Sequence, residues 1–300
     1  MDEFDFIDLL RPLAGAGALD LRDDAALMQV SQDKEIVLSK DTMVEGVHFP
    51  KGRIGGGFSE RLLRTALSDL AAKGARPIGY MLSVAWPKGS DPKWMAGFVK
   101  GLSEAQAAFD CPLLGGDTTS TNGPLVASAT VFGEVPKGGA VLRSGAREGD
   151  DVWFTGRLGL AEKGLALLMG KTLTLSADEL LACEEAYLRP QPRFLFRKTL
   201  RAYASAAADI SDGLLSEAEH IARASNVALH IDAQHIEAAS FGDDYELIFT
   251  ASPAHKEALL TGAEKINLPL TLCGTVKSGE GVWVDDKPIS PKGYRHKFEG

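Results

Sequence analysis

The residues best suited to chemistry in this sequence are aspartates that lie beside glycines or at the predicted ends of strands. A carboxylate in such a place can point into a shared cleft, and its oxygen atoms are the hard ligands that Mg²⁺ prefers. Several carboxylates in one cleft repel one another unless a cation lies between them. We therefore expect a magnesium site. Its candidate ligands are Asp23, Asp24, Asp41, Asp69, Asp117, Asp209, Asp212, Asp243 and Asp244.

A single aspartate of this kind is more often a turn or helix cap, because its carboxylate accepts hydrogen bonds from backbone N–H groups. Two segments are harder to explain in that way. In LLGGDTT an apolar run enters paired glycines and then presents Asp117 beside two hydroxyls. In DISDGL, Ser211 and Asp212 lie at the predicted start of a helix, whose free N–H groups suit a phosphate or a metal-bound carboxylate.

Other phosphate and metal motifs fit the sequence less well. The segment GLALLMGKT at 164–172 resembles a Walker A loop, but five strong helix formers separate its glycines where that loop has four residues. GAGAL at 15–19 lacks the third glycine and the preceding strand of a dinucleotide-binding fingerprint. No HExxH pattern is present. His48, seven residues after Asp41, is a candidate contact to an anionic substrate.

The elements that would position these residues follow from hydrophobic periodicity. A β-branched run at 36–39 predicts a strand that delivers Asp41 at its C-terminal end. A helix is predicted over 59–74, with Asp69 about 20° from one edge of its apolar side. That apolar side carries Leu62, Leu63, Ala66, Leu67 and Leu70. The opposite side carries Arg61, Arg64 and Ser68.

The rest of the chain also alternates strands with helices. Further strands are predicted at 78–86, 125–135, 151–155, 227–231, 245–250, 270–273 and 282–284. Further helices are predicted at 91–109, 158–169, 176–188 and 211–224. This pattern favours a mixed α/β (α+β) fold. The polar, glycine-rich stretch 136–149 predicts a boundary between two domains, 1–140 and 141–300.

Composition excludes several classes of function. The formal net charge of −9 argues against a nucleic-acid-binding or anionic-membrane surface. No segment approaches the eighteen consecutive apolar residues of a membrane span, and the acidic N-terminus lacks the pattern of a signal peptide. Three widely spaced cysteines suggest neither a disulfide framework nor a zinc site. We expect a cytoplasmic protein with reduced thiols.

Taken in order along the chain, the motifs resemble those of a known family. They are RDDAAL, LSKDTMVEGVHF, LSDLAAKGARP, LLGGDTT, LRSGAREGD, DISDGL and GDDYEL. This sequence resembles the thiamine-monophosphate kinase family, within the superfamily of aminoimidazole ribonucleotide synthetase and selenophosphate synthetase. The resemblance covers about residues 20–298. It implies two mixed α/β domains of that superfamily's type. The first would bind ATP and magnesium and form a homodimer, and the ATP site would lie at the domain interface.

The resemblance also implies roles for individual residues. The implied Mg²⁺ ligands are Asp24, Ser39, Asp41, Asp69, Asp117, Asp209 and Asp212. The implied ATP contacts are Gly116, Asp117, Arg143 and Ser211. The implied contacts to thiamine monophosphate are His48, Asp243 and Tyr294. The implied reaction is direct in-line transfer of the ATP γ-phosphoryl group to thiamine monophosphate, positioned by metal ions and without a dedicated general base.

Four departures from the family pattern leave alternatives open. Arg22 stands where the family usually has glycine, and Lys40 stands where it has a hydroxyl residue. Asp243 replaces a longer glutamate, and the segment 230–241 is shorter than usual. The alternative interpretations are a related phosphotransferase with a different acceptor, and a non-catalytic nucleotide- and metal-binding protein in which Lys40 balances the acidic cluster.

Overall fold

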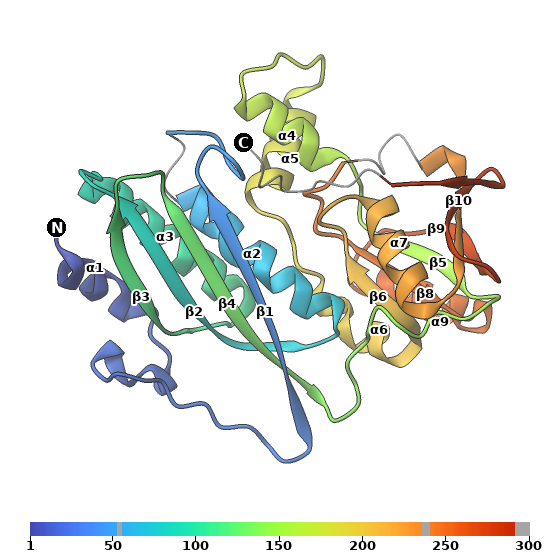
Figure 1. The fold of residues 1–300 in the computed structure, drawn as a ribbon, viewed down its shortest axis with the longest axis horizontal. Coiled ribbons are helices and arrows are strands. Elements are labelled where there is room, and N and C mark those ends of the chain that lie inside the picture. Colours follow the sequence, from blue (N-terminus) through green and yellow to red (C-terminus); the bar gives the residue numbers. More distant parts are fainter. Residues whose placement is uncertain (53–55, 236–240, 292–300) are drawn as a thin grey trace. The chain divides into compact units, whose positions relative to one another are not determined.

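The computed structural model describes residues 1–52, 56–235 and 241–291. Its internal contacts divide the chain into two compact units. Unit 1 comprises Met1–Leu70 and Ala75–Gly138. Unit 2 comprises Ala71–Gly74 and Gly139–Gly300. Each unit contains one mixed α/β layer arrangement (Figure 1). No helix among the described residues is long and apolar enough to cross a membrane.

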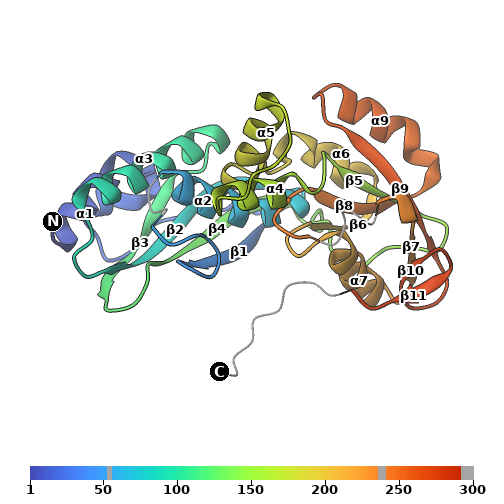
Figure 2. The same cartoon turned by 90° about the horizontal axis from the view of Figure 1, so that it is seen from above.

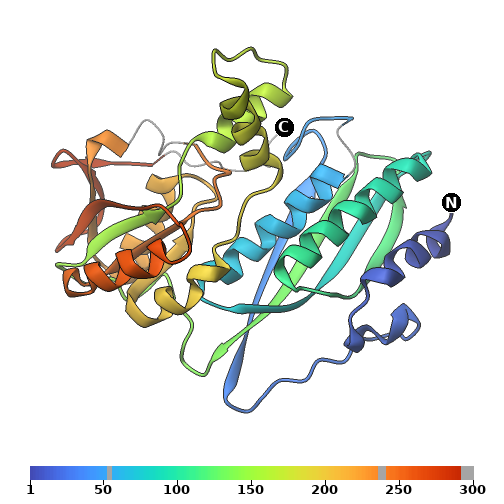
Figure 3. The same cartoon turned by 180° about the vertical axis from the view of Figure 1, so that it is seen from behind.

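Unit 1 is built on a four-stranded sheet with strand order β1-β4-β2-β3. Its strands are β1 Lys34–Val44, β2 Arg76–Pro87, β3 Leu113–Thr121 and β4 Val126–Pro136. β4 pairs antiparallel with β1 and β2, and β3 pairs parallel with β2. Helices α2 (Gly56–Ala72) and α3 (Pro92–Phe109) cover one face of the sheet (Figure 3). Among the described residues of unit 1, no helix covers the opposite face (Figure 1).

Local sequence explains where the unit 1 helices begin. Asp91 caps α3, since its carboxylate accepts the N–H of Lys93 at 2.8 Å, and Pro92 stands at the first helical position. The short helix α1 (Glu3–Leu10) has a capping box made by Asp2 and Asp5. Two 3₁₀ turns, Arg11–Leu13 and Ala16–Leu21, follow α1. The helix predicted at 91–109 is therefore confirmed.

Unit 2 is built on a seven-stranded mixed sheet with the order β11-β10-β7-β9-β5-β8-β6. Its strands are β5 Asp151–Thr155, β6 Ala204–Asp209, β7 Ala228–Ile231, β8 Leu247–Ala251, β9 Leu270–Lys277, β10 Gly281–Val284 and β11 Lys287–Ile289. Its helices are α4 Leu160–Leu168, α5 Ala177–Leu188, α6 Arg197–Tyr203, α7 Leu214–Ser225 and α9 Lys256–Glu264. Only β7 and β10 pair in parallel among these described strands.

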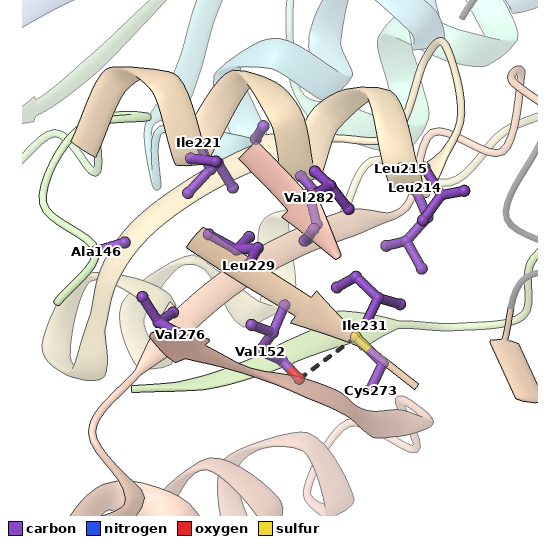
Figure 4. Close-up of a cluster of buried hydrophobic side chains, with 14 of the residues drawn as sticks. Ala146, Val152, Leu214, Leu215, Ile221, Leu229, Ile231, Cys273, Val276 and Val282 are labelled. Carbon is purple, nitrogen blue, oxygen red and sulfur yellow. Dashed lines mark hydrogen bonds between the residues drawn. The ribbon is translucent and has the colours of Figure 1, made fainter. Parts of the chain in front are cut away.

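The unit 2 sheet has a hydrophobic core on each face, because successive side chains of a strand point to opposite faces. On β5, Val152 belongs to the core under α7, and Trp153 belongs to the core under α6 and α9. Figure 2 shows α7 on one side of this sheet and α6 and α9 on the other. Figure 4 shows the first core, where the thiol of Cys273 contacts the carbonyl oxygen of Val152 at 3.4 Å.

Three sequence predictions need correction. Asp41 lies inside β1 and not at its end, because β1 pairs with β4 over its whole length. LLGGDTT forms strand β3, since parallel pairing with β2 outweighs the weak strand preference of Gly and Asp. Helix α7 begins at Leu214, so Ser211 and Asp212 precede the helix.

A fourth correction concerns helix α2, whose polar side is also buried. Leu62, Leu67 and Leu70 have no exposed surface, as predicted. Arg64 is only 6% exposed, however, because its guanidinium pairs with Glu60 one turn earlier at 3.4 Å and lies over the ring of Phe109. Arg61 and Ser68 are buried as well.

Candidate functional site

In unit 1, three predicted ligands meet between strand β1 and helix α2. The hydroxyl of Ser39 donates a hydrogen bond to Oδ2 of Asp69 at 2.5 Å. Asp41, two residues further along β1, faces the same helix and accepts a hydrogen bond from the Thr65 hydroxyl. Burial and the neighbouring Asp69 carboxylate raise the pKa of Asp41 to about 6. The two carboxylates therefore crowd one another.

This donor set fits a magnesium ion. One hydroxyl and two carboxylates are hard oxygen ligands, and the raised pKa of Asp41 marks negative charge that a cation would offset. Within the described residues, no three His, Cys, Asp or Glu side chains are arranged to hold a metal by themselves. Ser39, Asp41 and Asp69 would thus supply only part of the coordination shell of such an ion. Mg²⁺ usually keeps several waters as its remaining ligands.

The structure does not bring the other predicted unit 1 ligands to this group. Asp117 pairs across the sheet with Ser83, in one row with Ser128 and Thr42, whose hydroxyls are 2.7 Å apart. Because side chains alternate along a strand, this row lies on the face opposite to Asp41. Asp24 is exposed in the segment that precedes β1.

Strand register also places the unusual Lys40. Lys40 is exposed and pairs with Thr130 of β4, so it lies on the face opposite to its neighbours Ser39 and Asp41. Its ammonium group therefore does not lie between Asp41 and Asp69. The register gives no support to the idea that Lys40 serves as a counter-charge for these two carboxylates.

Gly116 and His48 are each fixed by a close backbone contact. A Cβ on Gly116 would lie 1.8 Å from the carbonyl oxygen of Leu82, so only glycine fits there. The backbone N–H of Val44 donates to Nδ1 of His48 at 3.0 Å, which leaves the proton of a neutral ring on Nε2. Glu45 holds the far end of this loop, since its Oε1 accepts the N–H of Gly52 at 2.9 Å.

In unit 2, the DISDGL and GDDYEL segments are bound to each other through their backbones. The N–H of Asp243 donates to the carbonyl of Ser211 at 2.7 Å, and the N–H of Tyr245 donates to that of Ile210 at 2.8 Å. Gly242 is required at this crossing, because a Cβ there would lie 2.1 Å from the Ser211 oxygen. The structure thus brings Asp243 beside Ser211 and Asp212. Asp209 ends β6 at the same place.

Three acidic residues of unit 2 are buried near these segments: the candidate ligand Asp244, and Glu217 and Glu246, which the sequence analysis did not assign. Glu217, in the first turn of α7, is 1% exposed and pairs with Arg143. Burial raises its pKa to about 7, although Arg143 opposes the shift. Asp244 accepts the N–H of Gly159, before α4, at 2.9 Å, and burial raises its pKa to about 8. Glu246 pairs with Arg193.

The sequence places Glu217 within a predicted helix, but nothing in the sequence indicates that its side chain is buried. An acid in the first turn of a helix is favoured by the helix dipole, and such acids are usually exposed. Only the fold shows that Arg143, 74 residues earlier in the chain, reaches this carboxylate. Tyr294, the remaining predicted contact, lies outside the described residues.

Comparison with known proteins gives consistent similarities. Residues 22–135 match the family described as "AIR synthase related protein, N-terminal domain". A thiamine-monophosphate kinase of Caulobacter vibrioides is 40% identical over 304 residues, covering 93% of this chain and 85% of the relative.

Two solved structures are also similar. One is thiamine-monophosphate kinase from Stenotrophomonas maltophilia K279a, with a TM-score of 0.84, 39% identity and coverage of 96% and 98% of the two chains. The other is AaThiL complexed with AMPPCP and TMP, with a TM-score of 0.79, 31% identity and coverage of 98% and 97%.

Proposed function

The chain belongs to the thiamine-monophosphate kinase family, and we propose that it transfers the γ-phosphoryl group of ATP directly to thiamine monophosphate, giving thiamine diphosphate and ADP. One observation carries the proposal: sequence and fold similarity to these kinases extends over nearly the whole chain. A relative of the same fold is complexed with AMPPCP, an ATP analogue, and TMP. The enzyme is accordingly an ATP-dependent phosphotransferase.

The reaction needs positioning and charge neutralisation more than acid–base chemistry. The acceptor phosphate already carries a nucleophilic oxygen, which attacks the γ-phosphorus of ATP while the bond to the β-phosphate oxygen breaks. Both reactants are anions. Magnesium, when bound, would neutralise phosphate charge. The proposed ligands would serve several ions: Ser39, Asp41 and Asp69 form one group, and the others are Asp24, Asp117, Asp209 and Asp212.

The remaining site residues would bind the two reactants. Gly116 and Asp117 of β3, with Arg143 and Ser211 of unit 2, would contact ATP. His48, Asp243 and Tyr294 would contact thiamine monophosphate. The hydrogen bond from the Asp243 N–H to the Ser211 carbonyl supports this assignment, because it keeps a substrate contact next to a nucleotide contact. His48 would donate Nε2–H to the substrate phosphate, since its Nδ1 already accepts the Val44 N–H.

We also propose that the enzyme is a cytoplasmic homodimer. The face of the unit 1 sheet without a helix carries apolar side chains, of which Leu38 is 61% exposed and Met81 is 40% exposed. The family resemblance implies that this face packs against the same face of a second copy of the chain. All three cysteines are free and buried, as suits a reducing compartment.

A product assay tests the function. Purified protein is incubated with MgATP and thiamine monophosphate, and thiamine diphosphate is separated by chromatography. Thiamine as the acceptor, and omission of the metal, serve as controls. We expect thiamine diphosphate only with the phosphorylated acceptor and the metal. ATP binding without this product would favour a different acceptor or a nucleotide-binding protein without turnover.

A further inference from the structure

Glu217 is a buried carboxylate that contacts the proposed nucleotide-binding residues of unit 2. Its Oε2 lies 3.2 Å from Nη2 of Arg143, and its Oε1 lies 3.4 Å from the hydroxyl of Ser211. The backbone N–H of Asp212 also donates to this carboxylate. A buried carboxylate is unfavourable unless charged and polar partners compensate it. Here all of those partners come from the LRSGAREGD and DISDGL segments.

The same helix holds the Arg143 loop at a second point. The Ser225 hydroxyl, in the last turn of α7, accepts the N–H groups of Gly145 and Ala146, each at 3.1 Å. It also lies 3.1 Å from the carbonyl oxygen of Arg143, to which it donates. Eight residues separate Glu217 from Ser225, which is about 12 Å along a helix. Helix α7 therefore fixes the backbone of the loop at one end and the guanidinium at the other.

Arg143 remains able to bind a ligand while it is held. Its side chain is 45% exposed, whereas that of Glu217 is 1% exposed, so the carboxylate lies on the buried side of the guanidinium. A guanidinium has five N–H donors in a fixed plane, and the contact with Glu217 involves only Nη2. Holding a flexible arginine before its ligand arrives removes part of the entropy cost of binding.

We propose that Glu217 is a positioning residue for the nucleotide: its carboxylate orients the Arg143 guanidinium and the Ser211 hydroxyl toward the phosphates of ATP. This inference rests on the proposed function, since it takes Arg143 and Ser211 as ATP contacts. It also predicts whether neutralising Glu217 weakens or strengthens ATP binding. A carboxylate that merely repelled the phosphates would weaken ATP binding, and its neutralisation would strengthen that binding. A positioning carboxylate has the opposite effect.

The test is Glu217→Gln, which keeps the shape of the side chain and removes its charge. We expect the KM for MgATP to rise about tenfold, as for loss of one charge-assisted hydrogen bond, while the KM for thiamine monophosphate changes less than about twofold. Titration calorimetry with MgATP should show the same loss without an acceptor. The matched control is Glu219→Gln on the same helix, with a half-buried carboxylate, which should behave as the wild type does.

A double-mutant cycle separates positioning from general damage. If Glu217 acts through Arg143, Glu217→Gln should cause little further loss of ATP affinity in an Arg143→Ala background. Full additivity, or an unchanged or lowered KM for MgATP in the single variant, would overturn the inference. Should Glu217→Gln fail to fold, Glu217→Asp retains the charge but withdraws it by one methylene. A smaller rise in KM for MgATP is then expected, and a wild-type value contradicts the inference.

Failure of the proposed function and failure of the positioning role of Glu217 give different results. Wild-type protein that forms no thiamine diphosphate contradicts the proposed function, whatever Glu217 does. An active wild type with an unaffected Glu217→Gln variant contradicts the positioning role alone.

Discussion

At the scale of single residues, the site is marked by carboxylates that the protein itself does not fully compensate. Asp41 lies beside Asp69, and its pKa is raised to about 6 by burial and by that neighbour. An arrangement of this kind costs stability in the absence of a cation. It is explained if the two residues serve a bound metal and not the stability of the fold.

Asp69→Asn tests this explanation. We expect the variant to lower kcat by about a hundredfold or more, because the proposed magnesium ligand loses its charge. In metal-free buffer its melting temperature should equal or slightly exceed that of the wild type, because the repulsion on Asp41 is relieved. Asp33→Asn, at an exposed turn before β1, should change neither quantity. A fully active Asp69→Asn variant would refute the metal assignment.

Asp244 gives the protein a predictable pH dependence of stability. Burial first, and then nearby acids, raises its folded pKa to about 8 from the ordinary value of 3.8. Between these values the folded state holds a proton that the unfolded state has released, so this contribution to stability falls as the pH rises. An amide at this position would keep the acceptor for the Gly159 N–H and would not titrate.

Chemical denaturation of Asp244→Asn at pH 5 and pH 8 checks this effect. The loss of unfolding free energy between the two pH values should be smaller in the variant by about 2 kcal/mol or more. Asp285→Asn, at an exposed turn, should keep the wild-type dependence. Equal pH dependence in Asp244→Asn and wild type would mean that Asp244 stays ionised in the folded state.

The residues that sequence analysis missed share one property. Glu217 and Glu246 are buried acids whose partners are far away in the chain, and the burial of the candidate ligand Asp244 was not predicted either. A glutamate in a helix or an aspartate in a turn normally lies in water, so the residue type gives no hint of burial. The aspartates beside glycine were easier to find, because their position within a motif is itself unusual.

At the scale of elements, strand β3 shows how the two glycines of LLGGDTT differ. A Cβ on Gly116 would meet the Leu82 carbonyl oxygen at 1.8 Å, whereas one on Gly115 would meet only the end of Met81, at 3.9 Å. Close backbone approach therefore requires glycine at the second position and not at the first. Gly116 therefore allows β3 to pair with β2 and to carry Asp117.

The adjacent glycines provide a matched pair of variants. Gly116→Ala should destabilise the protein by about 1–3 kcal/mol, the usual cost of forcing an extra methyl group into a packed site. It should also lower turnover, because Asp117 would move with the strand. Gly115→Ala should retain nearly wild-type stability. Thermal melts and product assays of both variants measure this, and equal effects at the two positions would contradict the explanation.

Elements with strong local signals were predicted well. Helix α3 has its aspartate cap and proline, and helix α5 has the Ser176–Glu179 capping box. Strands with continuous apolar runs, such as β5, were also found. β3 and β6 were missed, because Gly, Ala, Ser and Asp favour strands weakly and these strands are stabilised by partners distant in sequence.

At the scale of the whole molecule, the proposed dimer predicts that a charge introduced at Leu38 changes the oligomeric state. Leu38→Asp would place a charge on the helix-free face of the unit 1 sheet and should convert a dimer into a monomer in light scattering. Leu181→Asp on α5, where the leucine is similarly exposed, should leave the dimer intact. A monomeric wild type, or a dimeric Leu38→Asp variant, would rule out this interface.

The central claim is the direct transfer of one phosphoryl group, and isotope tracing tests it most directly. The full chain is supplied with thiamine monophosphate and ATP labelled with phosphorus-32 in the γ-phosphoryl group. The account predicts that the label appears in thiamine diphosphate, with one labelled product for each ADP formed. Formation of ADP with the label in inorganic phosphate, and none in thiamine diphosphate, would contradict it.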